Sequence, residues 1–478
     1  MLFNSMPFCL YFPAVAGVYF LAPERWRWAW LLAASYGFYM AWEPGYVALL
    51  WISTAVDYVA ARRIAASSGG ARRVWLGASL TANLGLLFFF KYYNFFRDSL
   101  GAGARSAGLS LELPYSDFLL PLGISFYTFQ TLSYTIDVYR GERAPERHLG
   151  YFALYVCFFP QLVAGPIERA SRLLPQLRRA HAFDYDRVCD GLRLMAWGFF
   201  KKMVIADRLA VAVERVYAEP GGHSGPVLLL ATLAFGYQIY CDFSGYSDIA
   251  IGAARVMGVG LSPNFNRPYA ASSIRDFWRR WHMTLSAWFR DYVYVPLGGN
   301  RNSAAGWAAA ILVVFAASGL WHGANWTFLV WGLIHGGLLI AERGAVAVAP
   351  GLARIPHALK VALTFSAVHV GWIFFRAADL GEALEVVSGL LGGWGEVAEA
   401  TFWGAAVRAL GLGWGEVVLV CVAVAVVEAV QYAGSRAALQ PWFRAQPVAL
   451  RWAAYTAIFW TIFLAGVFRQ TEFYYFVF

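Results

Sequence analysis

Two histidines set among apolar and aromatic residues are the strongest candidates for chemistry in this chain. The first, His322, lies within S-G-L-W-H-G-A-N-W, where Gly319, Gly323 and Ala324 are small enough to permit close backbone approach. A neutral imidazole in such a dry setting can accept a proton near neutral pH. The alternative is a histidine that only hydrogen-bonds to a neighbouring helix. Polar residues within membrane segments are commonly functional, so we predict a catalytic role for His322.

The second histidine, His282, lies 40 residues earlier and follows D-F-W-R-R-W. The two histidines could orient one substrate, with one acting as base and the other as hydrogen-bond donor. They could also be metal ligands, but no third cysteine, histidine or carboxylate stands at a supporting spacing, so we expect no metal. His335 lies thirteen residues after His322, too far along a helix to share its site simply, and we expect it to serve packing.

Three arginines, Arg275, Arg279 and Arg280, stand on the turns before His282. Guanidinium groups bind phosphates well, so a phosphorylated acyl donor could dock beside them. The alternative is a basic loop that only sets the topology and contacts anionic lipid. We add Trp321 and Asn325, which flank His322, to the residues predicted to bind substrate or donor.

A polar group interrupts the apolar sequence at C-D-F-S-G-Y-S-D, residues 241–248. Its Asp242 and Asp248 could pair with arginines of the following loop, and we favour this structural interpretation. Cys241 could accept an acyl group as a nucleophile, but nothing nearby resembles an activating base. The five cysteines lack the spacing of a metal site, and free cysteine in apolar sequence behaves as a small hydrophobe.

The composition indicates which kind of protein positions these residues. The chain has 478 residues, of which 59% are hydrophobic and 14% are charged, and its mean hydropathy is +0.51. Soluble proteins carry about 25% charged residues, so the chain is predicted to be an all-α polytopic membrane protein. The net charge of +9 would suggest nucleic acid in a soluble chain. Here positive cytoplasmic loops explain it, and no nucleic acid partner is expected.

Apolar runs predict membrane helices near residues 6–22, 28–41, 45–60, 74–90, 192–217, 226–241, 327–341, 358–376, 415–431 and 451–468. We interpret 97–117 as a polar loop, 158–169 as a re-entrant piece bracketed by prolines, and 380–412 as ambiguous. The densest arginine loops are 62–73, 140–147, 169–187 and 275–301. Alternating the spans puts these loops on one side, predicted to be cytoplasmic, with the N-terminus outside. Without a repeat or linker, residues 1–478 are predicted to form one membrane domain.

Five long motifs make the chain similar to a known family. They are P-L-G-I-S-F-Y-T-F-Q-T-L-S-Y-T-I-D-V-Y-R-G, F-F-P-Q-L-V-A-G-P-I, Y-Q-I-Y-C-D-F-S-G-Y-S-D-I-A-I-G, F-W-R-R-W-H-M-T-L-S-A-W-F-R-D-Y-V-Y-V-P-L-G-G-N-R and G-L-W-H-G-A-N-W. On these runs the chain resembles the membrane-bound O-acyltransferase superfamily, and most closely its bacterial alginate O-acetylation branch. The runs are specific for the family and less specific for the polysaccharide.

The resemblance implies a ring of about eleven transmembrane helices around a central funnel, with re-entrant segments. It implies acyl transfer in which the histidine of W-H-G, His322, is essential, and it places the other family histidine at His282. Cys241 stands where this branch is expected to carry phenylalanine, which argues against a covalent cysteine mechanism.

The reaction implied is transfer of an acetyl group to a hydroxyl of an exported, alginate-like polysaccharide. No bound cofactor is expected, and the donor is acetyl-CoA or another acetyl thioester that enters from the cytoplasm. Transfer is direct or passes through an intermediate carrier. The implied partners are the lipid bilayer of the bacterial inner membrane and a separate periplasmic acetyltransferase that finishes the transfer.

Three rival functions remain open from the sequence. One is transfer of D-alanine toward teichoic acid from a carrier-protein thioester. Another is a transporter that uses Asp137, Asp242 and the histidines as a proton relay, although transporters commonly show internal repeats and none is found. A structural assembly subunit is the third, but such a subunit would not require His322.

Overall fold

The computed structural model describes residues 1–468 except 164, 350, 352–353 and 437–438, and the described residues form helices and loops without a β-strand. The chain divides into two compact units. Unit 1 consists of Met1–Leu192 and Ala250–Ser262, and unit 2 consists of Arg193–Ile249 and the residues from Pro263 onward. That residues 1–478 form one membrane domain stays a prediction.

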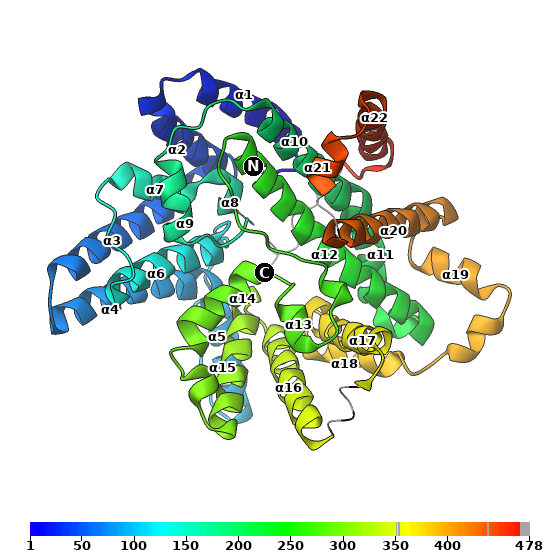
Figure 1. Cartoon of the computed structure of the whole chain (residues 1–478). Coiled ribbons are helices and arrows are strands. Elements are labelled where there is room, and N and C mark those ends of the chain that lie inside the picture. Colours follow the sequence, from blue (N-terminus) through cyan, green and yellow to red (C-terminus); the bar gives the residue numbers. More distant parts are fainter. Residues whose placement is uncertain (164, 350, 352–353, 437–438, 469–478) are drawn as a thin grey trace. The chain divides into compact units, whose positions relative to one another are not determined.

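Unit 1 is built from the N-terminal helices, which Figure 1 shows in blue to cyan. They are α1 (Met6–Leu21), α2 (Glu24–Met40), α3 (Val47–Ala66), α4 (Gly70–Leu87), α5 (Tyr93–Ser106), α6 (Ile124–Arg140), α7 (Leu149–Cys157), α8 (Phe159–Leu162) and α9 (Ala170–Leu177). Helix α10 (Tyr185–Phe199) leads into unit 2.

Unit 2 contains the remaining helices. They are the π-helical segment η3 (Phe200–Ala206), α11 (Asp207–Tyr217), α12 (Gly225–Val256), α13 (Ile274–Trp278), α14 (Met283–Phe289), α15 (Ala304–His322), α16 (Trp326–Val348), α17 (His357–Arg376), α18 (Leu380–Gly389), α19 (Phe402–Ala409), α20 (Trp414–Arg436), α21 (Leu439–Arg444) and α22 (Val448–Ala465). Helix α12 ends in unit 1.

Seven helices in the described part of the chain are long and apolar enough to cross a membrane. They are Gly70–Ser106, Gly225–Val256, Ala304–His322, Trp326–Val348, His357–Arg376, Trp414–Arg436 and Val448–Ala465. These helices make the chain a polytopic membrane protein, as predicted. The total of about eleven spans and the central funnel stay predictions.

Most apolar runs coincide with helices, and two interpretations are wrong. Residues 97–117 do not form one loop, because α5 continues to Ser106. Residues 241–248 do not separate two runs, because they lie inside the 32-residue helix α12. In the piece at 158–169, the described residues contain only the four-residue helix α8, which is far too short to span a bilayer. The ambiguous stretch 380–412 contains the two short helices α18 and α19.

A buried aspartate joins three neighbouring helices of unit 1. Asp57 on α3 is fully buried and accepts hydrogen bonds from Asn83 on α4, at 2.9 and 3.0 Å, and from Thr135 on α6, at 3.2 Å. Helices α3, α4 and α6 accordingly lie side by side in Figure 1. A buried carboxylate is costly unless its oxygens are hydrogen-bonded, so these donors fix how the three helices pack.

The basic loops of unit 1 lie together at one end. The contacts that join them are the Arg72 guanidinium to the Tyr139 carbonyl at 2.5 Å, the Tyr58 hydroxyl to the Arg147 carbonyl at 2.5 Å, and the ion pair of Arg178 with Glu146. The predicted clustering of loops 62–73, 140–147 and 169–187 on one side is therefore confirmed within unit 1. Which side of the membrane they face stays a prediction.

Candidate active site

The candidate site lies in unit 2 and starts with two helices in backbone contact. Helices α15 and α16 run side by side (Figure 1), joined by a short turn. A methyl group added at Gly319 would lie 2.2 Å from the carbonyl oxygen of Phe328, and one at Gly332 would lie 2.2 Å from that of Phe315. One at Gly323 would overlap the Phe328 ring at 2.1 Å. The close approach predicted at Gly319 and Gly323 is confirmed.

This contact positions His322, the last residue of α15. The side chain is 2% exposed, and its ring lies 5.0 Å from the Trp331 ring of α16 and 5.3 Å from the Phe375 ring of α17, between centroids. The C-terminal end of a helix carries partial negative charge, which stabilises a positive charge nearby. The position therefore suits an imidazole that gains a proton during a reaction.

His282 is the residue before α14 and is completely buried. Its Nδ1 lies 3.1 Å from the side-chain oxygen of Asn264, and its ring meets the Phe243 ring edge-on at 4.6 Å. His282 lies outside the seven candidate spans, and burial lowers the pKa of its imidazole to about 3, so the ring is neutral at pH 7. Its φ of 41° is unusual, because left-handed backbone is uncommon for a residue other than glycine.

The structure brings the two predicted histidines together. The ring centroids of His282 and His322 are 6.4 Å apart, although His322 ends α15 and His282 precedes α14. The Trp321 ring lies 5.0 Å from His322 and 5.8 Å from His282, so it contacts both. Two imidazoles this close can both contact one substrate molecule, because a hydrogen bond spans about 2.8 Å. Their catalytic roles stay a prediction.

His335 lies near this pair and is linked to His322 through the Trp331 ring. The Trp331 ring lies between the two histidines, 5.0 Å from His322 and 5.1 Å from His335. His335 is fully buried, the Trp278 ring also lies 5.1 Å away, and neither ring nitrogen has a hydrogen-bond partner among the described residues. These contacts agree with a packing role.

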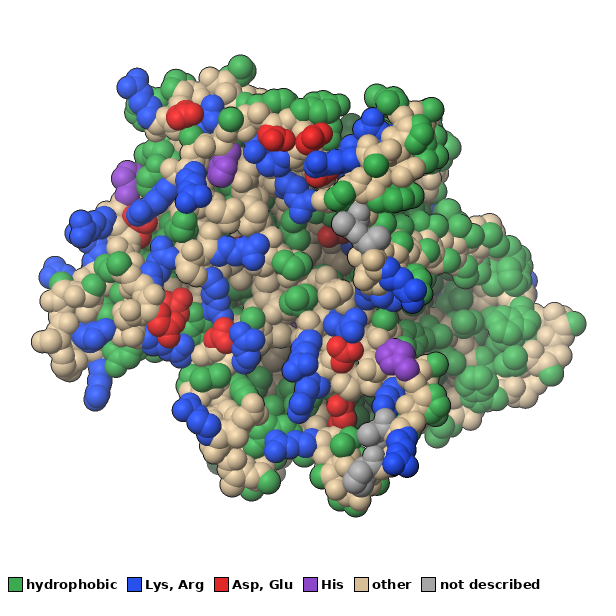
Figure 2. All heavy atoms as spheres, viewed as in Figure 1, with side chains coloured by type: hydrophobic (Ala, Val, Ile, Leu, Met, Phe, Trp, Pro, Cys, Tyr) green, Lys and Arg blue, Asp and Glu red, His purple; other side chains and the backbone are tan. Residues whose placement is uncertain are grey.

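Of the five residues predicted to bind substrate or donor, Trp321 contacts both histidines and the other four do not. Arg275 on α13 and Arg279, the residue after this helix, are exposed, while Arg280 pairs with Asp276 at 2.8 Å. Basic side chains gather over α13 on the face shown in Figure 2. Asn325 caps α16, because its oxygen accepts from the Thr327 amide at 3.1 Å and its amide donates to the Ala378 carbonyl at 2.7 Å. None of these four residues has a described contact with either histidine, and donor binding by them stays a prediction.

The aspartates of α12 pair with lysines, which corrects the expected pairing with arginines. Lys202 on η3 lies 2.7 Å from Asp242 and 2.8 Å from Asp207, and Lys201 lies 2.7 Å from Asp248. The π-helical turn of η3 brings two successive lysines against α12, because such a turn inserts an extra residue into the helix. The basic partners of these aspartates thus lie within a helical segment and not in the following loop. Both lysines are buried.

Asn264 was missed as a site residue. It is 1% exposed and holds His282 by a direct side-chain contact. The only sequence signal is its place in the turn-forming run N-F-N-R-P-Y, which does not by itself indicate a contact with a histidine. Among the described residues no three metal-ligating side chains gather into a site.

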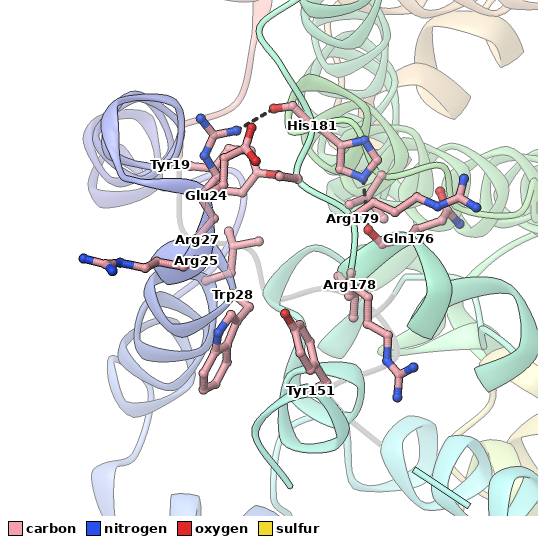
Figure 3. Close-up of a pocket in the computed structure, with 14 residues that line it drawn as sticks. Tyr19, Glu24, Arg25, Arg27, Trp28, Tyr151, Gln176, Arg178, Arg179 and His181 are labelled. Carbon is pink, nitrogen blue, oxygen red and sulfur yellow. Dashed lines mark hydrogen bonds between the residues drawn. The ribbon is translucent and has the colours of Figure 1, made fainter. Parts of the chain in front are cut away.

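A separate cavity of about 270 Å³ lies in unit 1 (Figure 3). The Trp28 and Tyr151 rings lie together at one end, 5.3 Å apart between centroids, and Arg27 closes the other end by donating to the His181 carbonyl at 2.8 Å. The guanidinium groups of Arg25 and Arg179 point away from the hollow in Figure 3. None of the residues predicted to form the site lines this cavity.

Comparison with known proteins identifies the protein family to which this helical chain with its histidine pair is similar. A sequence model of the membrane-bound O-acyltransferase family matches residues 146–375, which include both histidines. The protein named "Probable alginate O-acetylase" of Azotobacter vinelandii is 42% identical over 80% of this chain and 76% of its own length. A peptidoglycan O-acetyltransferase of Helicobacter pylori is 37% identical over 76% of this chain and 73% of its own.

A teichoic acid D-alanyltransferase of Bacillus subtilis is 32% identical, but over only 46% of this chain and 58% of its own length. The alginate-related likeness, in contrast, extends over most of both chains. The chain belongs to the membrane-bound O-acyltransferase family, in the branch that contains the alginate O-acetylases. The resemblance recognised from the five motifs is confirmed.

Proposed function

We propose that this protein is a membrane-bound O-acetyltransferase that moves acetyl groups from a cytoplasmic thioester toward hydroxyl groups of an exported polysaccharide. The observation that carries the proposal is the buried histidine pair, 6.4 Å apart, in a chain of this family. The names of its relatives support a polysaccharide acceptor, since they specify alginate and peptidoglycan acetylation.

In the proposed reaction His322 is the general base. A sugar hydroxyl attacks the thioester carbonyl, and His322 takes the hydroxyl proton as the C–O bond forms. The resulting tetrahedral intermediate collapses, the C–S bond breaks, and the thiolate leaves with a proton that the imidazolium returns. The acetyl ester and the free thiol are the products, so no protein nucleophile is needed. The buried aromatic walls exclude water that would otherwise hydrolyse the thioester.

The donor in this proposal is acetyl-CoA or another acetyl thioester, and the protein lies in the bacterial inner membrane with its N-terminus outside. The exposed arginines on and next to α13 offer phosphate-binding groups at the entry side. A periplasmic acetyltransferase would complete the transfer onto the polymer. Alginate is the first candidate polymer, and peptidoglycan is the second because a relative at 37% identity carries that name.

The test measures ester-linked acetate on exported polysaccharide in cells that carry wild type, His322→Ala or His369→Ala. His369 is a buried histidine of α17 without a described contact to the pair, so it serves as the matched control. Loss of a general base lowers rates by about 10²–10⁴-fold, so His322→Ala should abolish detectable acetate at equal protein level. His369→Ala should retain acetate.

Normal acetate in the His322→Ala cells would contradict the proposal. Acetate on peptidoglycan and D-alanine esters are measured in the same cells, because they separate the possible acceptors and acyl groups. If the D-alanine esters alone depend on His322, the acetyl assignment is wrong while the acyltransferase assignment stands. If no ester depends on His322, the assignment of the histidine fails.

A further inference from the structure

Asn264 makes an unusual number of contacts with the turn that carries His282. Its side-chain oxygen lies 3.1 Å from His282 Nδ1, 2.9 Å from the Thr284 hydroxyl and 3.4 Å from the Thr284 backbone nitrogen. Its own carbonyl accepts from the Met283 amide at 2.9 Å. Asn264 therefore binds three successive residues of the turn, and it is 1% exposed.

The hydrogen on the His282 ring follows from this arrangement. A backbone N–H can only donate, so the Asn264 atom that faces Thr284 is the carbonyl oxygen, and the amide nitrogen faces Ser247 Oγ at 3.4 Å. An amide oxygen can only accept, so His282 Nδ1 carries a hydrogen. Since a neutral imidazole has a single N–H, the lone pair lies on Nε2. The ring is neutral at pH 7 because burial disfavours its charged form.

The backbone at His282 is held by contacts from the same segment, which indicates that the position of this residue is closely determined. Its left-handed φ of 41° is maintained by the Met283 bond to Asn264 and by a second bond, from the Asn266 amide to the Arg280 carbonyl, at 2.9 Å. A sparsely populated backbone conformation persists only where surrounding contacts determine it, and such positions cluster at functional sites. The segment around Asn264 provides those contacts.

We propose that Asn264 is a positioning residue that fixes His282 as its Nδ1–H tautomer, so that Nε2 accepts a hydrogen bond from a second hydroxyl of the acceptor sugar. The proposal rests on the proposed acetyl transfer and deepens it. The sequence left open which histidine is the base and which donates a hydrogen bond. In the proposed tautomer Nε2 of His282 is an acceptor, so it cannot donate to the acyl carbonyl oxygen. His282 thereby orients the sugar whose neighbouring hydroxyl His322 deprotonates.

The tautomer is tested directly on the full chain in liposomes. Solid-state NMR of protein labelled with ¹³C and ¹⁵N in its eight histidines distinguishes the two neutral ring forms, and a His282→Gln variant identifies the His282 signals. The Nδ1–H form is expected in wild type and in Thr284→Val, which keeps the backbone N–H. It should disappear in Asn264→Leu. A wild-type His282 in the Nε2–H form would overturn the proposal.

Activity then separates positioning from packing. Asn264→Leu should lower acetyl transfer at least about tenfold at an equal level of folded protein, because a wrong tautomer disables a catalytic histidine. Asn264→Asp should restore most of the rate, since a carboxylate also accepts from both Nδ1 and Thr284. Equal losses in the Leu and Asp variants would mean that Asn264 only packs. Should His322→Ala leave acetylation intact, the proposed function fails, while the NMR result still decides the tautomer.

Discussion

Replacing Lys202 by methionine should strongly destabilise unit 2. The lysine side chain is 1% exposed, and its Nζ lies 2.8 Å from Asp207 and 2.7 Å from Asp242. Both carboxylates are almost completely buried, at 2% and 4% side-chain exposure. Methionine matches the length of lysine but removes the positive charge that lies between the two carboxylates.

The magnitude follows from the burial of all three groups. Removing one partner of a buried ion pair costs about 3–5 kcal/mol, because the other charge remains in a medium that solvates it poorly. At about 1.4 kcal/mol per factor of ten, the unfolded fraction should rise by about two to nearly four orders of magnitude. Here two carboxylates lose the same cation, so we expect the upper part of that range.

The assay is equilibrium unfolding of the purified protein in mixed micelles, and the matched control is the triple variant Lys202→Met, Asp207→Asn, Asp242→Asn. Neutralising all three members of a buried ionic group is often tolerated, so the triple variant should recover most of the lost stability. Two results would refute the reasoning: Lys202→Met as stable as wild type, or a triple variant as unstable as the single one.

Two further predictions concern the site and the topology. Gly319→Ala should lower acetyl transfer and cost about 1–3 kcal/mol of stability, because its methyl would lie 2.2 Å from the Phe328 carbonyl oxygen. Gly337→Ala, with nothing within 4 Å, should be neutral, and equal effects of the two would contradict the packing. Cysteines placed at exposed Arg62 and Arg301, in a chain whose native cysteines are replaced, should resist an impermeant thiol reagent outside intact cells and react in inverted vesicles. Labelling from outside would reverse the predicted orientation.

Hydropathy and the long motifs predict much of this structure because they depend on local sequence. Helices α1, α16, α17, α20 and α22 coincide with apolar runs, since a membrane helix must be apolar along its whole length. The polar residues of α12 broke that pattern. Asp242 and Asp248 are tolerated within a helix because Lys202 and Lys201 neutralise them, and those partners stand 40 and 47 residues earlier in the chain.

In the candidate site, too, contacts between residues distant in the sequence could not be predicted. His322 and His282 were identifiable from their motifs, but only the folded chain brings their rings within 6.4 Å. Asn264 escaped notice because its role depends on a turn formed by residues eighteen to twenty positions later. Asparagine is common in turns, so its identity alone does not indicate a contact with a histidine ring.

The contact between α15 and α16 restricts how these positions can change in evolution. A side chain added at Gly319 or Gly332 would collide with a carbonyl oxygen of the main chain, at Phe328 or Phe315. Every amino acid carries that oxygen, so no substitution at the facing residue relieves the collision. Side-chain clashes in a protein core can be compensated by trimming the partner, whereas these two glycines have no partner to trim. A second mutation at the contact therefore cannot compensate for a substitution of either glycine. Each glycine must be conserved for His322 to hold its position.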